Sequence, residues 1–255
     1  MKSLAVVGGA GRMGQVMARG LGAYPQFKVV ALVDLHEPVD LFGAVYAATL
    51  DGVDPEVVDA VVDFSNPEGV VASAKWCAAH GVALVVGATG LTSEQRQAVE
   101  EAATRVGVVM ASNFAIGAVL SERFARIAAP HFERVEIIEL HHERKVDAPS
   151  GTSITTALAI AEARAAAGQA PLEDPTTRET LPGARGADGA NGVRIHSVRL
   201  AGLLAHQEIL FGGPGEGLTI RHDSYDRESF VPGVALALDA LDATPQFLEG
   251  IDSLL

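Results

Sequence analysis

Two adjacent histidines and a lysine stand close together near the middle of the chain. His141, His142 and Lys145 belong to the polar segment 139–152, which reads Glu-Leu-His-His-Glu-Arg-Lys-Val-Asp-Ala-Pro-Ser-Gly-Thr. Elsewhere the basic residues are mostly arginine, with fifteen arginines against four lysines in the whole chain. Lysine can release a proton near neutral pH when its surroundings allow it, whereas arginine effectively cannot. The residue types and their spacing therefore predict a site for proton transfer.

Two other interpretations of the histidine pair are open. A histidine can be a buried structural residue, and in an extended strand His141 and His142 would face opposite sides, so that only one could serve the chemistry. A metal site would need a third histidine, cysteine or carboxylate at ligand spacing. The H-H-x-x-K pattern lacks that ligand, and no H-E-x-x-H occurs in the chain. We therefore expect no metal.

Small residues follow the lysine. Ser150, Gly151 and Thr152 come just before an alanine-rich stretch and are typical of the start of a helix. The first turn of a helix carries N–H groups without partners, and these can receive a carboxylate or a phosphate. A helix cap and a clamp for an anionic substrate are compatible at this place.

Three glycines stand at the start of the chain with the spacing G-x-x-G-x-x-G. Gly8, Gly11 and Gly14 follow a short apolar run and open a helical pattern. This is a variant of the Rossmann fingerprint, in which glycines allow a tight turn and the close approach of a pyrophosphate. Glycines alone could mark a structural turn, but their place between strand and helix favours dinucleotide binding.

An acidic residue closes the second predicted strand. Asp34 lies where a carboxylate can accept hydrogen bonds from the adenosine ribose. Its charge would repel the 2′-phosphate of NADP, and only Arg12 and His36 could offset that repulsion nearby. We expect NADH as the cofactor, and Arg12 leaves NADPH open.

Two later turns complete the set of candidate cofactor contacts. Segment 87–90 reads Gly-Ala-Thr-Gly and segment 111–114 reads Ala-Ser-Asn-Phe, each directly after a predicted strand. Open α/β sheets bind ligands at the carboxyl ends of their strands. Position alone fits cofactor contacts and ordinary strand-to-helix loops equally well.

Composition excludes several classes of protein. The 255 residues are 48% apolar and carry a net charge of −13, which disfavours nucleic acid and anionic membranes as partners. Cys77 is the only cysteine, so no disulfide can form within the chain. No apolar run is long enough to span a bilayer. We expect a cytoplasmic protein.

The elements that must position these residues change in kind along the chain. Up to residue 114, predicted strands alternate with helices, which indicates a parallel sheet of Rossmann type. The strands are predicted at 4–7, 28–33, 60–64, 82–86 and 108–111, and the helices at 12–21, 68–80 and 92–106. Segment 36–55 fits neither pattern.

Beyond residue 114 strands follow one another without helices between them, which indicates a mixed, largely antiparallel sheet in a second, α+β domain. The pattern predicts strands at 133–141, 193–200, 207–211 and 218–222, helices at 117–129, from 151 onward and at 230–241, and a glycine-rich mobile loop at 183–192. We expect residues 1–114 and about 224–255 to form a dinucleotide-binding domain. Residues of about 115–223 then form a second domain.

Taken together, the motifs resemble the 4-hydroxy-tetrahydrodipicolinate reductase family, long called dihydrodipicolinate reductases. The resemblance covers essentially the whole chain and is most specific in segment 139–152. It also includes the glycine turn, Asp63-Phe64-Ser65 and the turns at 87–90 and 112–114. The resemblance implies reduction of (2S,4S)-4-hydroxy-2,3,4,5-tetrahydrodipicolinate to tetrahydrodipicolinate by NAD(P)H, a step toward diaminopimelate and lysine. It also implies a homotetramer formed by the second domain.

The resemblance assigns roles to matching residues. His141 would be the proton donor and acceptor and Lys145 a proton donor, while His142, Gly151 and Thr152 would bind the substrate. The implied cofactor contacts are Gly8, Gly9, Ala10, Gly11, Arg12, Met13, Asp34, Gly87, Ala88, Thr89, Ala111, Ser112, Asn113 and Phe114.

The chain departs from the family pattern in three places. Leu35 stands where many members carry a basic residue, which weakens the case for NADPH. Ala88 replaces a common threonine. Segment 205–207 reads Ala-His-Gln where Gly-Glu-His is frequent, so the role of that strand stays open. The alternatives are another nicotinamide reductase, such as an aspartate-dehydrogenase-like enzyme, and a non-catalytic dinucleotide sensor.

Overall fold

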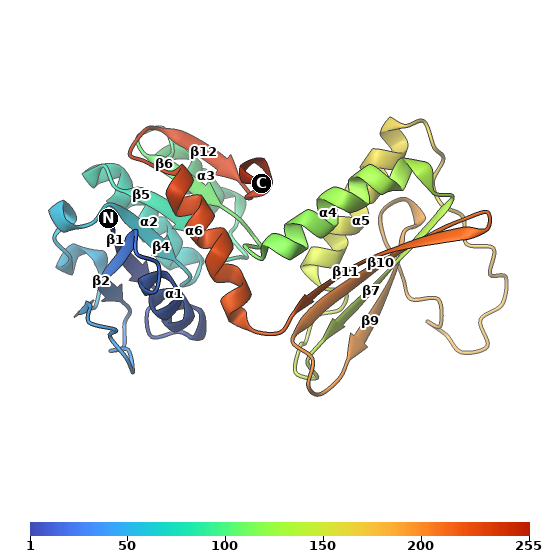
Figure 1. Ribbon diagram of the computed structural model, residues 1–255, viewed down its shortest axis with the longest axis horizontal. Helices are drawn as coiled ribbons and strands as arrows, with labels where there is room; N and C mark the ends of the chain where they lie inside the picture. The colour runs from blue at the N-terminus through green and yellow to red at the C-terminus, as the bar shows by residue number, and fades with distance from the viewer. The chain divides into compact units, whose positions relative to one another are not determined.

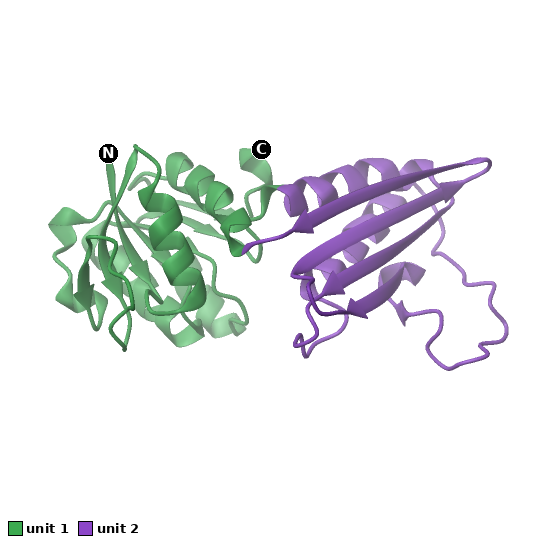
Figure 2. Ribbon diagram, turned by 60° about the horizontal axis from the view of Figure 1, so that its bottom comes forward, with its two compact units in different colours: residues 1–116, 227–255 green, residues 117–226 purple.

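A computed structural model describes all 255 residues of the chain. The chain forms two compact units, and Figure 2 shows them in different colours. Unit 1 comprises residues 1–116 and 227–255, and unit 2 comprises residues 117–226. The first unit is therefore built from both ends of the chain, and the second lies between them in sequence.

Unit 1 is built on a seven-stranded sheet whose order is β12-β6-β5-β4-β1-β2-β3. All its strand pairs are parallel. The inner strands are apolar on both faces, as a sheet covered by helices on each side requires. Its strands are β1 (Lys2–Val7), β2 (Phe27–Val33), β3 (Val45–Ala47), β4 (Ala60–Asp63), β5 (Ala83–Val86), β6 (Gly107–Met110) and β12 (Gln246–Glu249).

The helices of unit 1 cover its sheet in two layers. The helices are α1 (Arg12–Gly22), α2 (Pro67–His80), α3 (Ser93–Ala102) and α6 (Val231–Ala240). Helices α2 and α3 share one buried cluster with alternate strand residues such as Val61 and Leu84. The intervening residues, such as Val62 and Val85, are fully buried on the opposite face. Helix α6 packs against α1 (Figure 1), with Val231 directly over Gly20.

Three details of unit 1 differ from the sequence-based expectation. Segment 36–55 contains the edge strand β3 and a 3₁₀ turn at Leu50–Gly52, and a second such turn follows at Pro55–Val57. Helix α3 is shorter than the helix predicted at 92–106. A capping box formed by Thr92 and Gln95 sets its start, and the helix ends at Ala102. Strand β12, which lies beside β6 at the sheet edge, was not expected.

Unit 2 holds a mixed sheet of five strands in the order β11-β10-β7-β9-β8. Only the β7–β9 pair is parallel, and the other three pairs are antiparallel. Its strands are β7 (Arg134–His141), β8 (Ala187–Asp188), β9 (Arg194–Arg199), β10 (Ala205–Gly213) and β11 (Glu216–Ser224), and its helices are α4 (Ile116–Ala128) and α5 (Gly151–Ala166).

Both helices of unit 2 lie on one face of this sheet (Figure 2). Their small residues Ala125 and Ala157 pack with Ile137, Ile195 and Ile209 from the three central strands. The glycine-rich stretch at 183–192 contains the short strand β8 and a 3₁₀ turn at Ala190–Gly192. The predicted fold class, a Rossmann-type parallel sheet followed by an α+β unit with a mixed sheet, is confirmed.

Candidate active site

Four strand ends of unit 1 meet around one phenylalanine. A Cβ added to Gly8, after β1, would lie 2.9 Å from the backbone of Phe64, and one added to Gly87, after β5, would lie 2.2 Å from the Phe64 ring. The Phe114 ring, after β6, lies 6.0 Å from the Phe64 ring between centroids. The structure thus brings together the glycine turn and the turns at 87–90 and 111–114, as the rule for carboxyl ends of parallel strands requires.

The glycine turn leaves backbone donors without partners. Gly8 and Gly9 donate to the carbonyl of Val33, and Gly11 donates to that of Gly8. The first bond within α1 is donated by Gln15 to Gly11, so the amides of the preceding turn, residues 12–14, have no partner within the helix.

The N-cap of α1 differs from those of α2 and α5. Its N-cap is Gly11, which has no side chain to occupy the free amides. By contrast, α2 and α5 are capped by the side chains of Asn66 and Ser150. An uncapped helix start at a bare glycine turn fits a pyrophosphate, because the anion can supply the missing acceptors.

Asp34 is held in place beside the same turn. One of its carboxylate oxygens accepts from the Ala10 amide at 3.0 Å, and the other accepts from the His36 amide at 3.2 Å. The His36 ring is exposed and lies 4.0 Å from the carboxylate. Each oxygen keeps further acceptor capacity, which a ribose hydroxyl can use.

His141 is the last residue of β7, and its ring is oriented by a buried carboxylate. Its Nδ1 lies 2.5 Å from Oε2 of Glu139, a residue with no exposed surface. Burial lowers the pKa of His141 below its usual value, with smaller contributions from the positive charges of Lys145 and Arg199, while Glu139 acts in the opposite direction. A lowered pKa makes the imidazolium a stronger acid near neutral pH.

An arginine pairs with Glu139 from the neighbouring strand. Arg199 donates from Nη1 and Nη2 to the two carboxylate oxygens, each at 2.8 Å. Burial alone would raise the pKa of Glu139, but the hydrogen bonds, led by that of Arg199, bring it below the usual value. Glu139 therefore stays anionic and accepts a hydrogen bond from the Nδ1–H group of His141, which leaves Nε2 of the ring free of this contact.

Lys145 has a carboxylate partner of its own. Its ammonium donates to both oxygens of Asp147 at 2.8 Å, and the hydrogen bond lowers the pKa of Asp147. The Lys145 amide donates to the carbonyl of His142, which closes a turn directly after β7. Because the strand ends at His141, His142 is not forced to the opposite face of an extended strand.

Gly151 and Thr152 are the first residues of α5 and are exposed. Ser150 caps the helix by accepting from the Ser153 amide, and the first helical bond is donated by Ile154. The amides of Gly151 and Thr152 therefore precede the helical ladder and can receive an anion.

The predicted site residues thus fall into two groups, one in each unit. The candidate cofactor residues lie in unit 1, and His141, His142, Lys145, Gly151 and Thr152 lie in unit 2. Sequence reasoning missed Glu139 and Arg199. The signal available was the alternation of β7, because Val135, Ile137, Glu139 and His141 occupy the same face of the strand.

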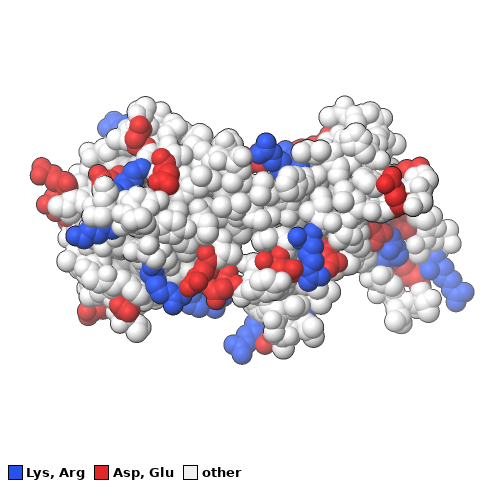
Figure 3. Space-filling view, in the orientation of Figure 1, with Lys and Arg blue, Asp and Glu red and all other residues white.

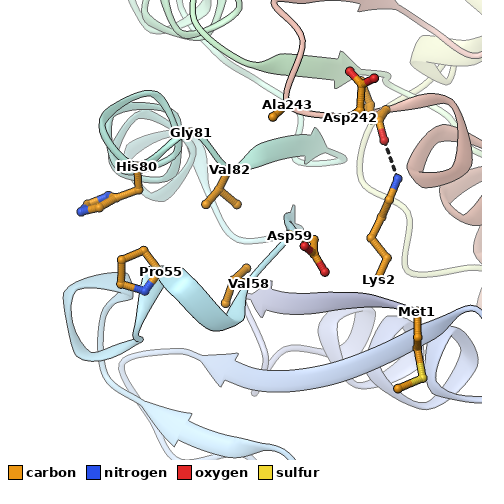
Figure 4. A pocket seen from close by; sticks show the side chains of 11 residues that line it. Met1, Lys2, Pro55, Val58, Asp59, His80, Gly81, Val82, Asp242 and Ala243 are labelled. Carbon is orange, nitrogen blue, oxygen red and sulfur yellow. Dashed lines mark hydrogen bonds between the residues drawn. The ribbon is translucent and has the colours of Figure 1, made fainter.

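A hollow in unit 1 lies away from these turns, at the amino ends of the strands, where β1 begins (Figure 4). It has a volume of about 470 Å³ and is lined by Lys2, Asp59, His80 and Asp242 among others. Lys2 donates to the backbone carbonyls of Leu238 and Leu241, and Asp59 accepts from the Ser3 amide at 2.7 Å. None of the predicted site residues lines it.

Charged side chains of both signs are interspersed on the face of the molecule in Figure 3. The basic side chains on that face do not gather into one patch, which agrees with the net charge of −13. None of the helices has the length and apolar character that a membrane span needs.

Comparison with known protein families shows to which family the chain belongs. The family model described as "Dihydrodipicolinate reductase, N-terminus" matches residues 2–114, and the one described as "Dihydrodipicolinate reductase, C-terminus" matches residues 117–255. The chain belongs to the dihydrodipicolinate reductase family. It is therefore an oxidoreductase with a Rossmann-like unit for a nicotinamide nucleotide, and the family resemblance seen in segment 139–152 is confirmed.

Individual relatives agree with the family assignment. The chain is 47% identical to 4-hydroxy-tetrahydrodipicolinate reductase of Nocardia farcinica, over 98% of this chain and 97% of the relative. Among solved structures, dipicolinate-bound dihydrodipicolinate reductase from Paenisporosarcina sp. TG-14 superposes with a TM-score of 0.88 at 38% identity, with full coverage of both chains.

Aspartate dehydrogenase from Thermotoga maritima matches with a TM-score of 0.51 at 13% identity, covering 94% of this chain and 96% of that one. Identity at that level shows a shared fold only. The aspartate-dehydrogenase-like alternative therefore gains no support beyond the common architecture of the dihydrodipicolinate reductase family and this dehydrogenase.

Proposed function

We propose that the chain reduces 4-hydroxy-tetrahydrodipicolinate to tetrahydrodipicolinate, with a nicotinamide nucleotide as the reductant. The observation that carries the proposal is the environment of His141, whose imidazole is oriented by a buried Glu139–Arg199 pair within the segment typical of the family. The Nocardia farcinica relative carries the name of this activity, and the Paenisporosarcina structure is described as dipicolinate-bound.

The residues of unit 1 fit the cofactor. The uncapped amides at the start of α1 would bind the pyrophosphate, and Asp34 would accept from the adenosine ribose. The turns at 87–90 and 111–114, which meet the glycine turn around Phe64, would line the remainder of the site. When bound, the nicotinamide supplies the hydride of the reaction.

We propose NADH as the preferred nucleotide. Asp34 is fixed by two backbone amides, so its negative charge cannot easily turn away from a 2′-phosphate. Leu35, with 79% of its surface exposed, offers no positive charge beside it. The comparison of kcat/KM for NADH and NADPH tests this point, and a strong preference for NADPH would refute it.

Unit 2 would hold the dianionic ring. The amides of Gly151 and Thr152 would receive one carboxylate at the start of α5, and His142 would contact the ring from the turn after β7. Local positive charge from Lys145, and from His141 when its ring is protonated, matters here, because the net charge of the protein would otherwise repel the substrate.

The reaction consumes one hydride and one proton and releases one water. Loss of the 4-hydroxyl group with a proton from C5 releases the water and gives an imine conjugated with a carbon–carbon double bond. Addition of hydride at C4 of this system leaves an electron-rich enamine, which must take up the proton at C5. His141 Nε2 would donate it, and Lys145 would serve as a second donor. General acid assistance of this kind is typically worth about 10²–10⁴-fold in rate.

A homotetramer formed through unit 2 is part of the proposal and rests on the family resemblance. Light scattering of the purified protein tests it by giving the mass in solution. A mass equal to a single chain of 26.4 kDa would refute it.

The decisive assay generates the substrate in situ and follows oxidation of NADH by absorbance. We expect turnover with the hydroxylated cyclic substrate and none with L-aspartate plus NAD. Turnover of L-aspartate would favour the aspartate-dehydrogenase-like alternative. Binding of NADH without oxidation would favour a dinucleotide sensor, and either result would contradict the proposal.

A further inference from the structure

One arginine of unit 2 is bonded to both parts of the chain that carry the proton donors. Arg199 is the last residue of β9 and pairs in register with His141, the last residue of β7. Residues paired in this way point to the same face of the sheet, and on that face Glu139 lies two residues before His141. The topology therefore places the guanidinium beside the imidazole and its carboxylate partner.

The position of Glu139 would normally be apolar. Val135 and Ile137 occupy the same face of β7 and belong to the core of unit 2, and Glu139 itself has no exposed surface. A carboxylate without partners at such a place is strongly destabilising. Arg199 satisfies it with two hydrogen bonds of 2.8 Å, so the Glu139 oxygen that faces His141 Nδ1 is held in one orientation.

The same guanidinium also reaches the loop that follows the strand. Arg199 Nη2 donates to the backbone carbonyl of Asp147 at 2.7 Å. The carboxylate of Asp147 in turn accepts from Lys145 on both oxygens. The amide of Leu200, the next residue, donates to the carbonyl of His141 at 3.0 Å. Arg199 and Leu200 therefore tie the histidine and the lysine loop to one strand end.

We propose, resting on the function proposed above, that Arg199 is a positioning residue that sets the orientation of the His141 ring through Glu139 and the placement of Lys145 through the Asp147 carbonyl. Arg199 contacts neither Nε2 of His141 nor the ammonium group of Lys145, the groups that would donate the proton. Its effect on the reaction is geometric, and a displacement of about 1 Å at a reacting group can cost about 10²-fold in rate.

Replacement of Arg199 alone would leave Glu139 buried without its main partner, so loss of activity could reflect loss of folding. The charge-balanced variant Glu139→Gln/Arg199→Met removes both charges. Replacing a buried ion pair with neutral groups of similar volume often preserves stability. We expect this double variant to unfold at a urea midpoint near that of the wild type. We expect its kcat to fall about 10²-fold with KM for the cyclic substrate changed less than about threefold.

A matched control is available in the same unit. Arg185 also pairs with a β7 glutamate, Glu136, but that residue lies five positions before His141. Arg185→Met should leave kcat unchanged. The proposal is overturned if the double variant keeps wild-type kcat, or if Arg185→Met lowers kcat as much as the double variant does.

A second measurement is independent of turnover. Nitrogen-15 NMR of the His141 ring reports which nitrogen carries the proton and the pKa of the ring. In the wild type we expect the Nδ1–H form of the neutral ring, and in the double variant a mixture of the two tautomers. An unchanged tautomer would overturn the positioning role even if the wild-type protein lacked the proposed activity. Conversely, a wild type that shows the Nδ1–H form but no turnover would refute the proposed function alone.

Discussion

Three glycines of α1 form a graded series for testing the dinucleotide turn. A Cβ added to Gly14 would lie 2.1 Å from the carbonyl oxygen of Gly8 and 2.9 Å from the Cα of Gly9. One added to Gly20 would lie 2.6 Å from a methyl group of Val231, and one added to Gly22 would meet nothing within 4 Å. Each substitution by alanine adds the same methyl group to the same helix. Differences in stability among the three variants therefore report on the atoms that surround each glycine.

The size of each effect follows from what would have to move. At Gly14 the shortfall from ordinary contact is 3.4 − 2.1 = 1.3 Å, and the obstacle is the backbone of the glycine turn itself. Gly14→Ala should therefore cost about 3 kcal/mol, at the upper end of overpacking. Gly20→Ala displaces a side chain and should cost about 1–2 kcal/mol. Gly22→Ala should stabilise by about 0.5–1 kcal/mol, since alanine favours the helix.

Urea unfolding followed by circular dichroism gives the free energies, and NADH fluorescence titration gives the affinities. We expect Gly14→Ala to lose NADH affinity by at least about 10-fold, because opening the turn displaces the amides proposed to bind the pyrophosphate, while Gly22→Ala should bind like the wild type. If Gly14→Ala bound NADH normally and unfolded within about 0.5 kcal/mol of the wild type, the assignment of this turn to the cofactor would be wrong.

Four further outcomes are expected. His141→Gln should lower kcat by about 10²–10⁴-fold with little change in KM, and an unchanged kcat would remove His141 from proton transfer. Lys145→Arg keeps the charge but not the easy release of a proton, so kcat should fall; near-full activity would mean that charge alone matters. Burial raises the pKa of the Cys77 thiol, so a thiol reagent should label it only after unfolding in urea; labelling of the native protein would contradict this. The Thr176 amide, and then Arg185, lower the pKa of Asp174 to about 2 from 3.8, so the wild type should be more stable than Asp174→Asn above about pH 4. That difference in stability should vanish as the pH falls through 2. A stability difference that does not change with pH would contradict the lowered pKa of Asp174.

Most of the fold could be predicted because its long elements carry their signals locally. Strands β1, β2, β4, β5 and β6 are short apolar runs, and each is followed by a turn or loop that glycine, proline or asparagine marks. The starts of α3 and α5 are visible as Thr92 and Ser150, which cap them in the structure. Strand β12 was missed because Gln246–Glu249 is brief and partly polar, and only its pairing with β6 makes it a strand.

The candidate site could be predicted only in part for a related reason. His141, Lys145 and Asp34 lie in segments whose spacing is informative by itself. Glu139 and Arg199 are sixty positions apart and become partners through the parallel pairing of β7 and β9. A buried ion pair that depends on strand register has no local signature, although the acidic residue in the apolar alternation of β7 marks one half of it.

The division of unit 1 between the two ends of the chain has a consequence for biosynthesis. When a ribosome has made residues 1–226, unit 2 has its whole sheet and both helices, while unit 1 still lacks β12 and α6. Until those last segments emerge, β6 has an open edge and Gly20 of α1 lacks the covering side chain of Val231. The unit that begins second is therefore finished first, and a nascent chain stalled before residue 227 exposes an unfinished surface that chaperones can recognise.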